Sequence, residues 1–494
     1  MPDRPHVILI VLDATRADHL SCYGYSRATT PNLDAFASRA TRYTNAWAGS
    51  TWTLPSIATL FTGVWPGKHG ANRRHPFLDT TLPTLAELLS AAGYDTYGVS
   101  NNSWISSATG FARGFRRFDK VWQLFQDGTD VLSDRMVGVF SNDQFGAKDL
   151  AKSVARGNPV KNLLNTFYGR VLYKRGDSGA AKVNRLVNGW LKQRAGSAPA
   201  GIFLHYLEPH LPFHPPQPWK SRFLPSGVSP RKVEQVNLDA WAYLAGHAEM
   251  TEEDFEIFVA LYDAEISYLD HRLGELFSML DDHRLLDDSQ VVVTADHGEN
   301  LGEHGLLDHQ YSVHEPLLNV PLLVKEPGAE AEAGRVNPAL VQSFDAFATL
   351  LRTARAEDPA AGERDAIPFP SAGGRARTHL FAEYLQPQPD PKVLEARFPG
   401  FDASPWDRAL STARNERFKY VLSSRGEEEL YDLQLDPGER ANVIQEHPPV
   451  AEELRAALRK RFGEDGPREG GDGDGLESLD GELRKRLEAL GYLA

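Results

Sequence analysis

The sequence predicts a large α/β domain with a doubly wound sheet, followed by a smaller C-terminal α+β subdomain. Three observations predict this fold class. Short, continuously apolar segments rich in β-branched residues alternate with helical periodicities along most of the chain. Beyond residue 378 the pattern changes to short strands separated by turn residues. The chain of 494 residues is also too long for one small core.

The predicted elements of the large domain follow one another as strand and helix. We expect buried strands at residues 7–12 (VILIVL), 96–100, 201–207 (GIFLHYL), 290–295 (QVVVTA) and 320–324. We expect helices at residues 32–40, 82–93, 162–173, 180–191, 254–280 and 342–351. Chemistry in open sheets of this kind lies at the carboxyl ends of the strands.

The domain boundaries follow from changes in composition. The large domain is expected at residues 5–353, with a partly helical insertion at 119–192 that is either a lid or a surface segment without a direct role. Residues 354–377 are rich in Ala, Pro, Gly and charge and predict a linker. An antiparallel subdomain is expected at residues 378–462, and a flexible acidic spacer with a terminal helix at 463–494.

The composition excludes several classes of function. The net charge of -14 gives the chain no electrostatic reason to bind nucleic acid or an anionic membrane surface. The single cysteine, Cys22, rules out an intrachain disulfide and a cysteine-based zinc cluster. No segment is long enough for a membrane span, and the apolar run at residues 7–12 is too short for a signal peptide, so a cytoplasmic location is expected. An anionic small-molecule substrate must then be held by a local site, most simply one with a metal.

Three predicted strand ends carry side chains that ligate divalent cations. Asp13 follows the first strand, Glu208 and His210 follow a later one (GIFLHYL), and Asp296 with His297 follows a third (QVVVTA). A single Asp at such a place can simply cap the next helix. Oxygen and nitrogen donors at three separate strand ends favour a metal site instead.

A second feature is the segment STWTLPSIATLFTG at residues 50–63. Pro55 and Ser56 are expected to open a helix, with Ser56 as its cap. The hydroxyl of Thr53 then lies just before the helix N-terminus, where backbone N–H groups and the helix dipole favour an anion. A nucleophile that attacks phosphorus or sulfur needs such a setting. The alternative is that Thr53 is an ordinary loop residue.

Several motifs, in their order and spacing, resemble the sulfatase family of the alkaline-phosphatase superfamily. They lie at residues 10–20 (IVLDATRADHL), 21–25 (SCYGY), 53–63, 204–216 (LHYLEPHLPFHPP), 294–305 (TADHGENLGEHG) and 430–442 (LYDLQLDPGERAN). The resemblance covers most of the chain. It implies a large mixed sheet flanked by helices and a metal-dependent hydrolase of small anionic sulfate or phosphate esters.

The resemblance also implies roles for individual residues. Asp13, Asp296 and His297 fall on metal ligands, and Thr53, which shares the metal, falls where the family carries the cysteine that becomes formylglycine. His210 falls on a histidine that contacts the oxyanion of the substrate. His309 falls on a Lys or His that does similar work and assists the leaving group.

The chain departs from the family at informative positions. The family's Cys-x-Pro-Ser-Arg signal reads Thr53-Leu54-Pro55-Ser56-Ile57, so both the Cys and the Arg are missing. Ala14 stands where many sulfatases have a second Asp. The Gly-Lys-Trp-His signature is absent, and the amides Asn101 and Asn102 replace two sulfate-binding cations.

The absence of the formylglycine motif affects which kind of ester we expect as the substrate. A formylglycine hydrate expels sulfate by reforming its aldehyde, whereas a threonine ester must be hydrolysed by water. This difference favours phosphoester or phosphodiester chemistry, with Thr53 as nucleophile and Zn²⁺ or Mn²⁺ at two sites. His210, His214 and His309 are a candidate second set, although His214 can equally be a loop residue in a Pro-rich segment. The alternatives are a sulfatase with one Ca²⁺ and a non-catalytic relative that binds anions.

Overall fold

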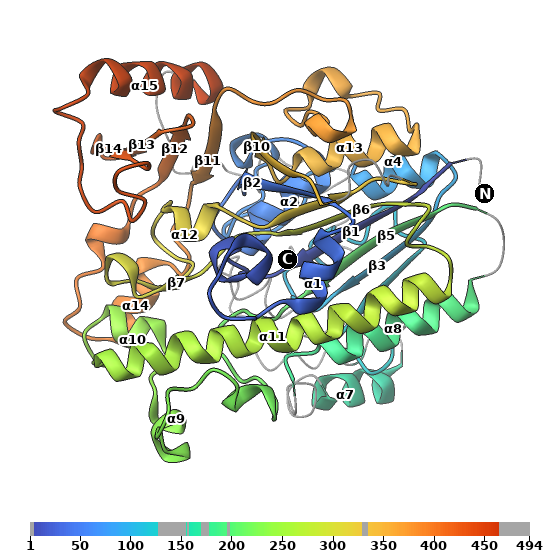
Figure 1. Ribbon diagram of the computed structural model, residues 1–494, viewed down its shortest axis with the longest axis horizontal. Helices are drawn as coiled ribbons and strands as arrows, with labels where there is room; N and C mark the ends of the chain where they lie inside the picture. The colour runs from blue at the N-terminus through green and yellow to red at the C-terminus, as the bar shows by residue number, and fades with distance from the viewer. Residues whose placement is uncertain are drawn as a thin grey trace.

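The computed structural model describes residues 4–126, 155, 158–168, 177–194, 198–328 and 334–463. Within these ranges, eight strands form one mixed sheet in the order β10-β2-β9-β6-β1-β5-β3-β4 (Figure 1). Their bounds are β1 His6–Leu12, β2 Thr41–Trp47, β3 Asp95–Ser100, β4 Arg117–Lys120, β5 Ala200–Tyr206, β6 Ser289–Ala295, β9 Leu322–Lys325 and β10 Val336–Gln342. β9 runs antiparallel to β2 and β6, and the other neighbours are parallel. The predicted fold class is confirmed.

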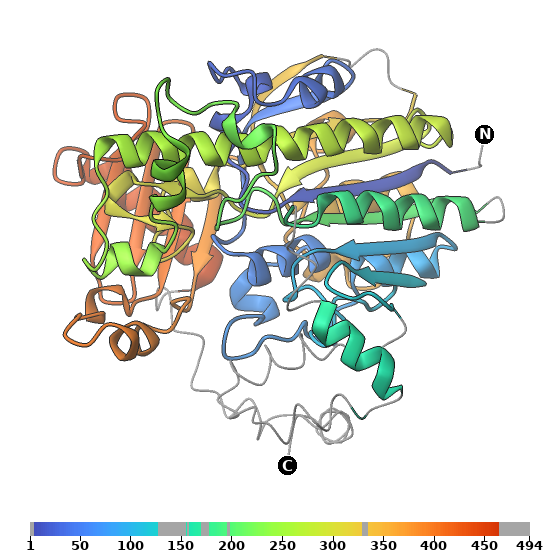
Figure 2. The same ribbon diagram turned by 90° about the horizontal axis from the view of Figure 1, so that it is seen from below.

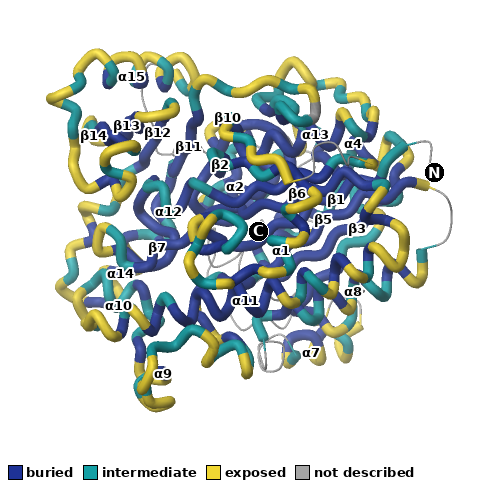
Figure 3. Tube along the Cα trace, in the orientation of Figure 1, coloured by how far each residue is buried: buried dark blue, intermediate teal, exposed yellow. Residues whose placement is uncertain are grey.

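The centre of the sheet is fixed by its most apolar strands. β1 is buried along its whole length and pairs with β5 on one side and β6 on the other, so that Ile10 stands opposite both Leu204 and Val293. Figure 3 shows β1, β5 and β6 as buried throughout. Since these three strands are parallel, their carboxyl ends meet at one edge of the sheet.

Helices cover both faces of this sheet. One face carries α2 Thr53–Thr62, α4 Leu85–Ala91 and α13 Asp345–Ala354, and the other carries α1 Pro31–Ala37, α8 Ala180–Gln193 and α11 Glu252–Asp282 (Figures 1 and 2). Capping boxes fix the starts of α4 and α11. Shorter elements are α3 Pro66–His69, α7 Pro159–Phe167, α9 Pro230–Gln235, α10 Ala240–Leu244, β7 Asn300–Leu301, β8 Leu307–Asp308, α12 Glu315–Leu318 and α14 Pro391–Arg397. No helix in the described ranges combines the length and apolar character needed to cross a bilayer.

The predicted strands of the large domain are confirmed, but the sequence patterns do not predict three further strands of the eight-stranded sheet. β2 (TRYTNAW) and β4 (RFDK) are short and carry polar residues, and β10 is an edge strand interrupted by Pro338. The helix predicted at 342–351 starts later, at Asp345, because the preceding residues complete β10. Within the predicted insertion, α8 packs against β3 and β5 and is part of the helix layer. Residues 127–154, 156–157 and 169–176 of that insertion lie outside the described residues.

A second, antiparallel sheet follows the first. It has the order β11-β12-β13-β14, with bounds Leu380–Tyr384, Leu410–Arg414, Phe418–Ser423 and Glu428–Asp432, and α15 Pro448–Phe462 packs against it. Glu383 ties it to the large domain, since its N–H donates to Gly49 O at 3.1 Å and its carbonyl accepts from Ser50 Oγ at 2.7 Å. The connecting segment 354–377 is packed rather than free: Phe369 is buried and Arg377 pairs with Asp345. The spacer and terminal helix predicted beyond Gly463 lie outside the described residues.

Candidate active site

The carboxyl ends of β1 and β6 bring two carboxylates and an imidazole together. Asp13, Asp296 and His297 are all buried, and one ligand atom from each lies within 4.8 Å of the others. The chain turns sharply at Ala14, whose φ of 53° lies in the left-handed region, and the Ala14 N–H donates to Asp296 Oδ1 at 3.2 Å. The turn after β1 therefore positions both carboxylates.

Several atoms of this group make no hydrogen bond, which indicates a cation site. In the part of the chain that the structure describes, Asp13 Oδ1 and Asp296 Oδ2 make no hydrogen bond although both are buried. His297 Nδ1 lies 2.8 Å from Gly298 O and carries the proton of that bond, which leaves Nε2 as a lone-pair donor. Nε2 lies 3.6 Å from Asp13 Oδ1 and 3.5 Å from Asp296 Oδ2. Two oxygens and one nitrogen thus converge as a divalent metal requires.

The electrostatics of the group agree with this interpretation. Burial by itself would raise the pKa of Asp13, but His210, His205 and His297 hold it well below its usual range. Burial and the neighbouring charge of Asp13 raise the pKa of Asp296 well above its usual value. Two buried carboxylates this close repel each other, and a bound divalent cation removes that penalty. Burial lowers the pKa of His297 to about 3, which keeps its imidazole neutral and able to ligate.

Thr53 lies beside these residues at the start of α2. Its Oγ1 is 3.3 Å from His297 Nε2 and 3.4 Å from Asn102 Nδ2. The helix begins at Thr53 itself, two residues earlier than Pro55, where we expected it to open. The prediction that Ser56 caps the helix is wrong, because Ser56 Oγ donates instead to Asp296 O at 2.5 Å. That bond holds the first turn of α2 against the end of β6.

Two further polar residues support Asp13 from the neighbouring strands. Asn102 Nδ2 donates to Asp13 Oδ2 at 2.9 Å, and His205 Nε2 lies 3.4 Å from the same oxygen. Asn101 does not join the group, because its Nδ2 donates to Ser178 O. Sequence reasoning missed His205; the signal was a lone imidazole inside an otherwise apolar strand.

His210 and His309 lie beside His297. The ring centroid of His309 lies 4.3 Å from that of His297 and 4.9 Å from that of His210. His210 Nδ1 lies 2.5 Å from Leu211 O and donates to it. The ring of His309 therefore contacts both of the other two imidazoles.

His309 is held between two carboxylates. Its Nδ1 lies 2.5 Å from Asp308 Oδ1 and 3.6 Å from Glu299 Oε1. Burial by itself would lower the pKa of His309, but Asp308 and Glu299 raise it well above its usual value. Burial would also raise the pKa of Asp308, yet His309 lowers it to about 2. The two carboxylates therefore favour the protonated form of His309.

Two residues from the predicted ligand sets lie elsewhere. Glu208 Oε1 accepts from the backbone N–H of Ala180 at the start of α8, so this carboxylate supports that helix instead of the site. His214 is exposed, and its backbone N–H donates to Glu265 Oε1 at 2.7 Å. The second metal set of His210, His214 and His309 is therefore not assembled, since only two of the three come together.

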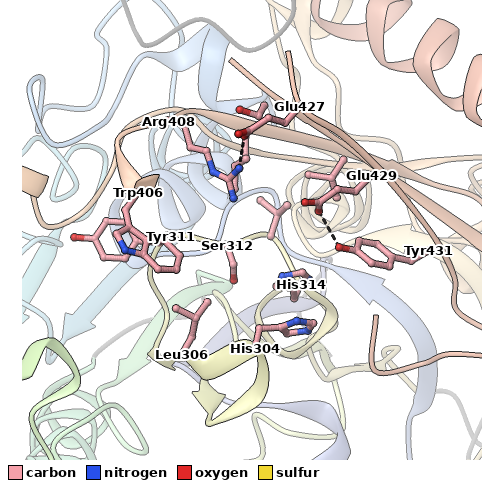
Figure 4. A pocket seen from close by; sticks show the side chains of 14 residues that line it. His304, Leu306, Tyr311, Ser312, His314, Trp406, Arg408, Glu427, Glu429 and Tyr431 are labelled. Atoms are coloured by element: carbon pink, nitrogen blue, oxygen red, sulfur yellow. Dashed lines mark hydrogen bonds and ion pairs between the residues drawn. The ribbon is translucent and has the colours of Figure 1, made fainter. Parts of the chain in front are cut away.

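A separate polar group lies between the large domain and the C-terminal sheet. The rings of His304 and His314 stack with centroids 3.7 Å apart at 7°, close to Glu439, beside a cavity of about 240 Å³ (Figure 4). One ligand atom from each of His304, His314 and Glu439 lies within 4.8 Å of the others. Lys419 Nζ already lies 2.7 Å from Glu439 Oε1.

The mixed sheet, the smaller antiparallel sheet and the strand-end site define a hydrolase of the alkaline-phosphatase-like fold. A family model described as "Sulfatase" matches residues 5–356, and one described as "N-sulphoglucosamine sulphohydrolase, C-terminal" matches residues 302–465. The chain belongs to the sulfatase family and is an ester-bond hydrolase. Membership of this family implies a divalent metal.

The relatives include enzymes of both sulfate and phosphorus chemistry. The chain is 25% identical to the multifunctional alkaline phosphatase superfamily protein PehA of Trinickia caryophylli, over 89% of this chain and 91% of that protein. It is 23% identical to an N-acetylglucosamine-6-O-sulfatase of Bacteroides thetaiotaomicron, over 89% and 83% of the two chains. Among solved structures, a phosphonate monoester hydrolase of Agrobacterium radiobacter superposes with a TM-score of 0.69 at 23% identity, over 92% of this chain and 95% of that one.

Proposed function

We propose that this protein hydrolyses phosphate esters through a covalent intermediate on Thr53, with one divalent cation between Asp13, Asp296 and His297. The observation that carries the proposal is the position of Thr53 Oγ1, 3.3 Å from His297 Nε2 at the N-terminus of α2. A hydroxyl in this place is close to the metal ligands and to the positive end of a helix. The ligand set, which includes an imidazole nitrogen, favours Zn²⁺ or Mn²⁺ over Ca²⁺.

The chain's own residues supply the remaining chemistry. A bound cation lowers the pKa of the Thr53 hydroxyl and neutralises charge on the transferred group. Thr53 Oγ1 loses its proton to water and forms a bond to phosphorus, while the bond from phosphorus to the leaving oxygen breaks. His309 gives that oxygen its proton from Nε2. Water then attacks phosphorus and gives a proton to His309, while the bond from phosphorus to Thr53 Oγ1 breaks. Thr53 Oγ1 takes back a proton from water, which restores the starting state.

Thr53 as the nucleophile favours a phosphate ester over a sulfate ester as the substrate. An enzyme that carries formylglycine releases sulfate by reforming an aldehyde, and Thr53 has no such route. The alternative is a sulfatase with one Ca²⁺.

The experiment that tests the preference compares matched esters. Purified protein loaded with Zn²⁺, Mn²⁺ or Ca²⁺ is assayed with phenyl phosphate, a phenyl phosphodiester and phenyl sulfate. We expect a phosphorus ester to have the highest kcat/KM, with Zn²⁺ or Mn²⁺ bound. A highest kcat/KM for phenyl sulfate with Ca²⁺ would instead establish the sulfatase. Ester binding without turnover under all conditions would contradict the proposed function.

A pH profile tests the role assigned to His309. In Asp308→Asn, loss of the carboxylate lowers the His309 pKa, while the amide oxygen still accepts from Nδ1. Below the pKa both proteins keep the imidazolium and their kcat values are similar. As the pH rises, the variant loses the imidazolium at a lower pH than the parent protein does. The alkaline limb of its kcat profile therefore moves to lower pH, and on that limb kcat falls by about tenfold for each unit by which the His309 pKa is lowered.

The control for this profile is Glu429→Gln, which removes a carboxylate that accepts from Tyr431 in the C-terminal sheet. That variant should keep the alkaline limb of the parent. An unmoved limb in Asp308→Asn would show that His309 does not set it.

A further inference from the structure

The helix α7 turns its polar side to the protein and its apolar side to solvent. Asn162, Asn165 and Thr166 are buried. Asn165 ties the helix to the segment after β4, because its Oδ1 accepts from the N–H groups of Leu124 and Phe125 at 2.9 and 2.8 Å and its Nδ2 donates to Phe125 O at 2.9 Å. This orientation is the reverse of that of a helix that covers a hydrophobic core.

The outward side of α7 carries an apolar stripe. Four side chains with the spacing i, i+3, i+4 and i+7 lie on one side of the helix and are 43% to 67% exposed: Val160, Leu163, Leu164 and Phe167. Leu124, which is 50% exposed and bonded to the same helix, extends the stripe. We call these five residues the α7 patch.

The α7 patch differs from ordinary scattered exposure. Its members are five of the eight large apolar side chains that are exposed in the described part of the chain. The other three lie on β10, on α14 and after β14. Clustered apolar exposure of this kind marks a surface that binds an apolar partner.

The charge around the patch indicates which kind of partner it fits. The chain as a whole has a net charge of -14, but residues 152–175, which include α7, contain six Lys or Arg and no Asp or Glu. A basic segment with Leu and Phe on one side of a helix is typical of helices that lie in the interface of an anionic bilayer. Association of two copies through this face would bring two basic segments together, so the charge disfavours a second copy as the partner.

The patch also lies near the edge of the sheet that carries the site. β1, β5, β3 and β4 are parallel neighbours, so their carboxyl ends share one edge. The segment that holds α7 follows directly after β4 ends at Lys120. Figures 1 and 2 show α7 at the outside of the molecule. A surface bound to the patch is therefore next to the edge at which Asp13 and Asn102 meet.

We propose that the α7 patch docks this protein reversibly on the surface of an anionic bilayer. Its apolar side chains enter the boundary between headgroups and acyl chains, and the basic charge of the segment is attracted to the anionic headgroups. The expectation that the chain avoids such a surface follows from its net charge, and this segment departs from that charge locally. Docking of this kind is independent of the reaction at Thr53.

Vesicle flotation tests the proposal with the full chain. The protein is mixed with vesicles of phosphatidylcholine and phosphatidylglycerol in equal amounts, or of phosphatidylcholine alone. We expect the protein to float with the anionic vesicles and to bind the neutral ones at least about tenfold more weakly. High salt should weaken the binding to anionic vesicles, because it screens the attraction to the headgroups. Thr53→Ala should float as the parent does, which separates docking from the proposed function.

Two variants locate the binding surface. Leu163→Glu combined with Phe167→Glu should weaken binding to the anionic vesicles by at least about tenfold. The matched control, Val393→Glu with Leu435→Glu, adds the same charge at two exposed apolar side chains outside the patch and should bind as the parent does. Thermal melting shows whether each variant is folded. Lys161→Gln keeps the apolar stripe, removes one positive charge and should weaken binding by about fivefold.

Three results would overturn the bilayer as the partner. The first is a parent protein that does not float with the anionic vesicles, and the second is an equal loss of binding in the matched control. The third is a dimer, measured by light scattering without vesicles, that dissociates in Leu163→Glu with Phe167→Glu, since it would assign the patch to a second copy. Binding that appears only after removal of residues 464–494 would likewise overturn it and assign the patch to the C-terminal segment.

Discussion

Replacing Thr53 with alanine is expected to lower kcat by ~1,000-fold or more, since removal of a covalent nucleophile leaves only binding and charge stabilisation. Steady-state assays with phenyl phosphate measure the loss. The bound metal should remain, because Asp13, Asp296 and His297 are untouched. Substrate affinity should change little, since the loss falls on the transition state.

Two variants control for the structural effect of this change. Thr53→Ser keeps a hydroxyl at the start of α2 and should retain measurable turnover. Thr62→Ala removes a hydroxyl from the other end of the same helix, where Thr62 Oγ1 donates to Ala58 O at 2.7 Å, and should keep the parent kcat. Turnover at the parent rate in Thr53→Ala would refute the nucleophile.

Asp296→Asn is expected to weaken metal binding by ~100-fold or more, because it removes an anionic ligand from the centre of the site. Asp296 Oδ2 is buried without a hydrogen bond, so a bound cation is its natural partner. The asparagine oxygen can still accept the N–H groups that Asp296 Oδ1 accepts from Ala14 and His297. Metal content after dialysis measures binding, and activity should return only at higher metal concentrations.

The parent protein should lose activity with a chelator and regain it with Zn²⁺ or Mn²⁺. Asp270→Asn is the matched control, since Asp270 is also a buried carboxylate but accepts from Asn32 and Leu33 at the start of α1. That variant should lose stability and keep its metal. Unchanged metal content in Asp296→Asn would place the cation elsewhere.

The centre of the molecule could be predicted from the sequence because its signals are local. The strands around Asp13 and Asp296 are continuous apolar runs, and parallel strands bring such residues to one edge. Thr53 could be singled out only through the resemblance to the sulfatase family, since the helix starts at Thr53 instead of Pro55 and Ser56 does not cap it. The strand positions needed no knowledge of how distant segments pack.

The positions of the remaining site residues depend on tertiary packing, which no local sequence pattern predicts. Glu208 and His210 are two residues apart, yet one supports α8 and the other enters the site. His205 reaches Asp13 only because β5 pairs in register with β1. Glu299 meets His309 only once β7 and β8 form their hairpin. The sequence of a polar strand such as β2 does not predict its burial, because neighbouring elements of the fold cover it.

The most direct test of the central claim is mass spectrometry of protein quenched in acid during turnover of 2-naphthyl phosphate. A peptide containing Thr53 should be heavier by one phosphoryl group, and the same peptide from Thr53→Ala should not be. A phosphoryl group on a different side chain, or unmodified Thr53 after a burst of naphthol equal to the amount of enzyme, would contradict the account.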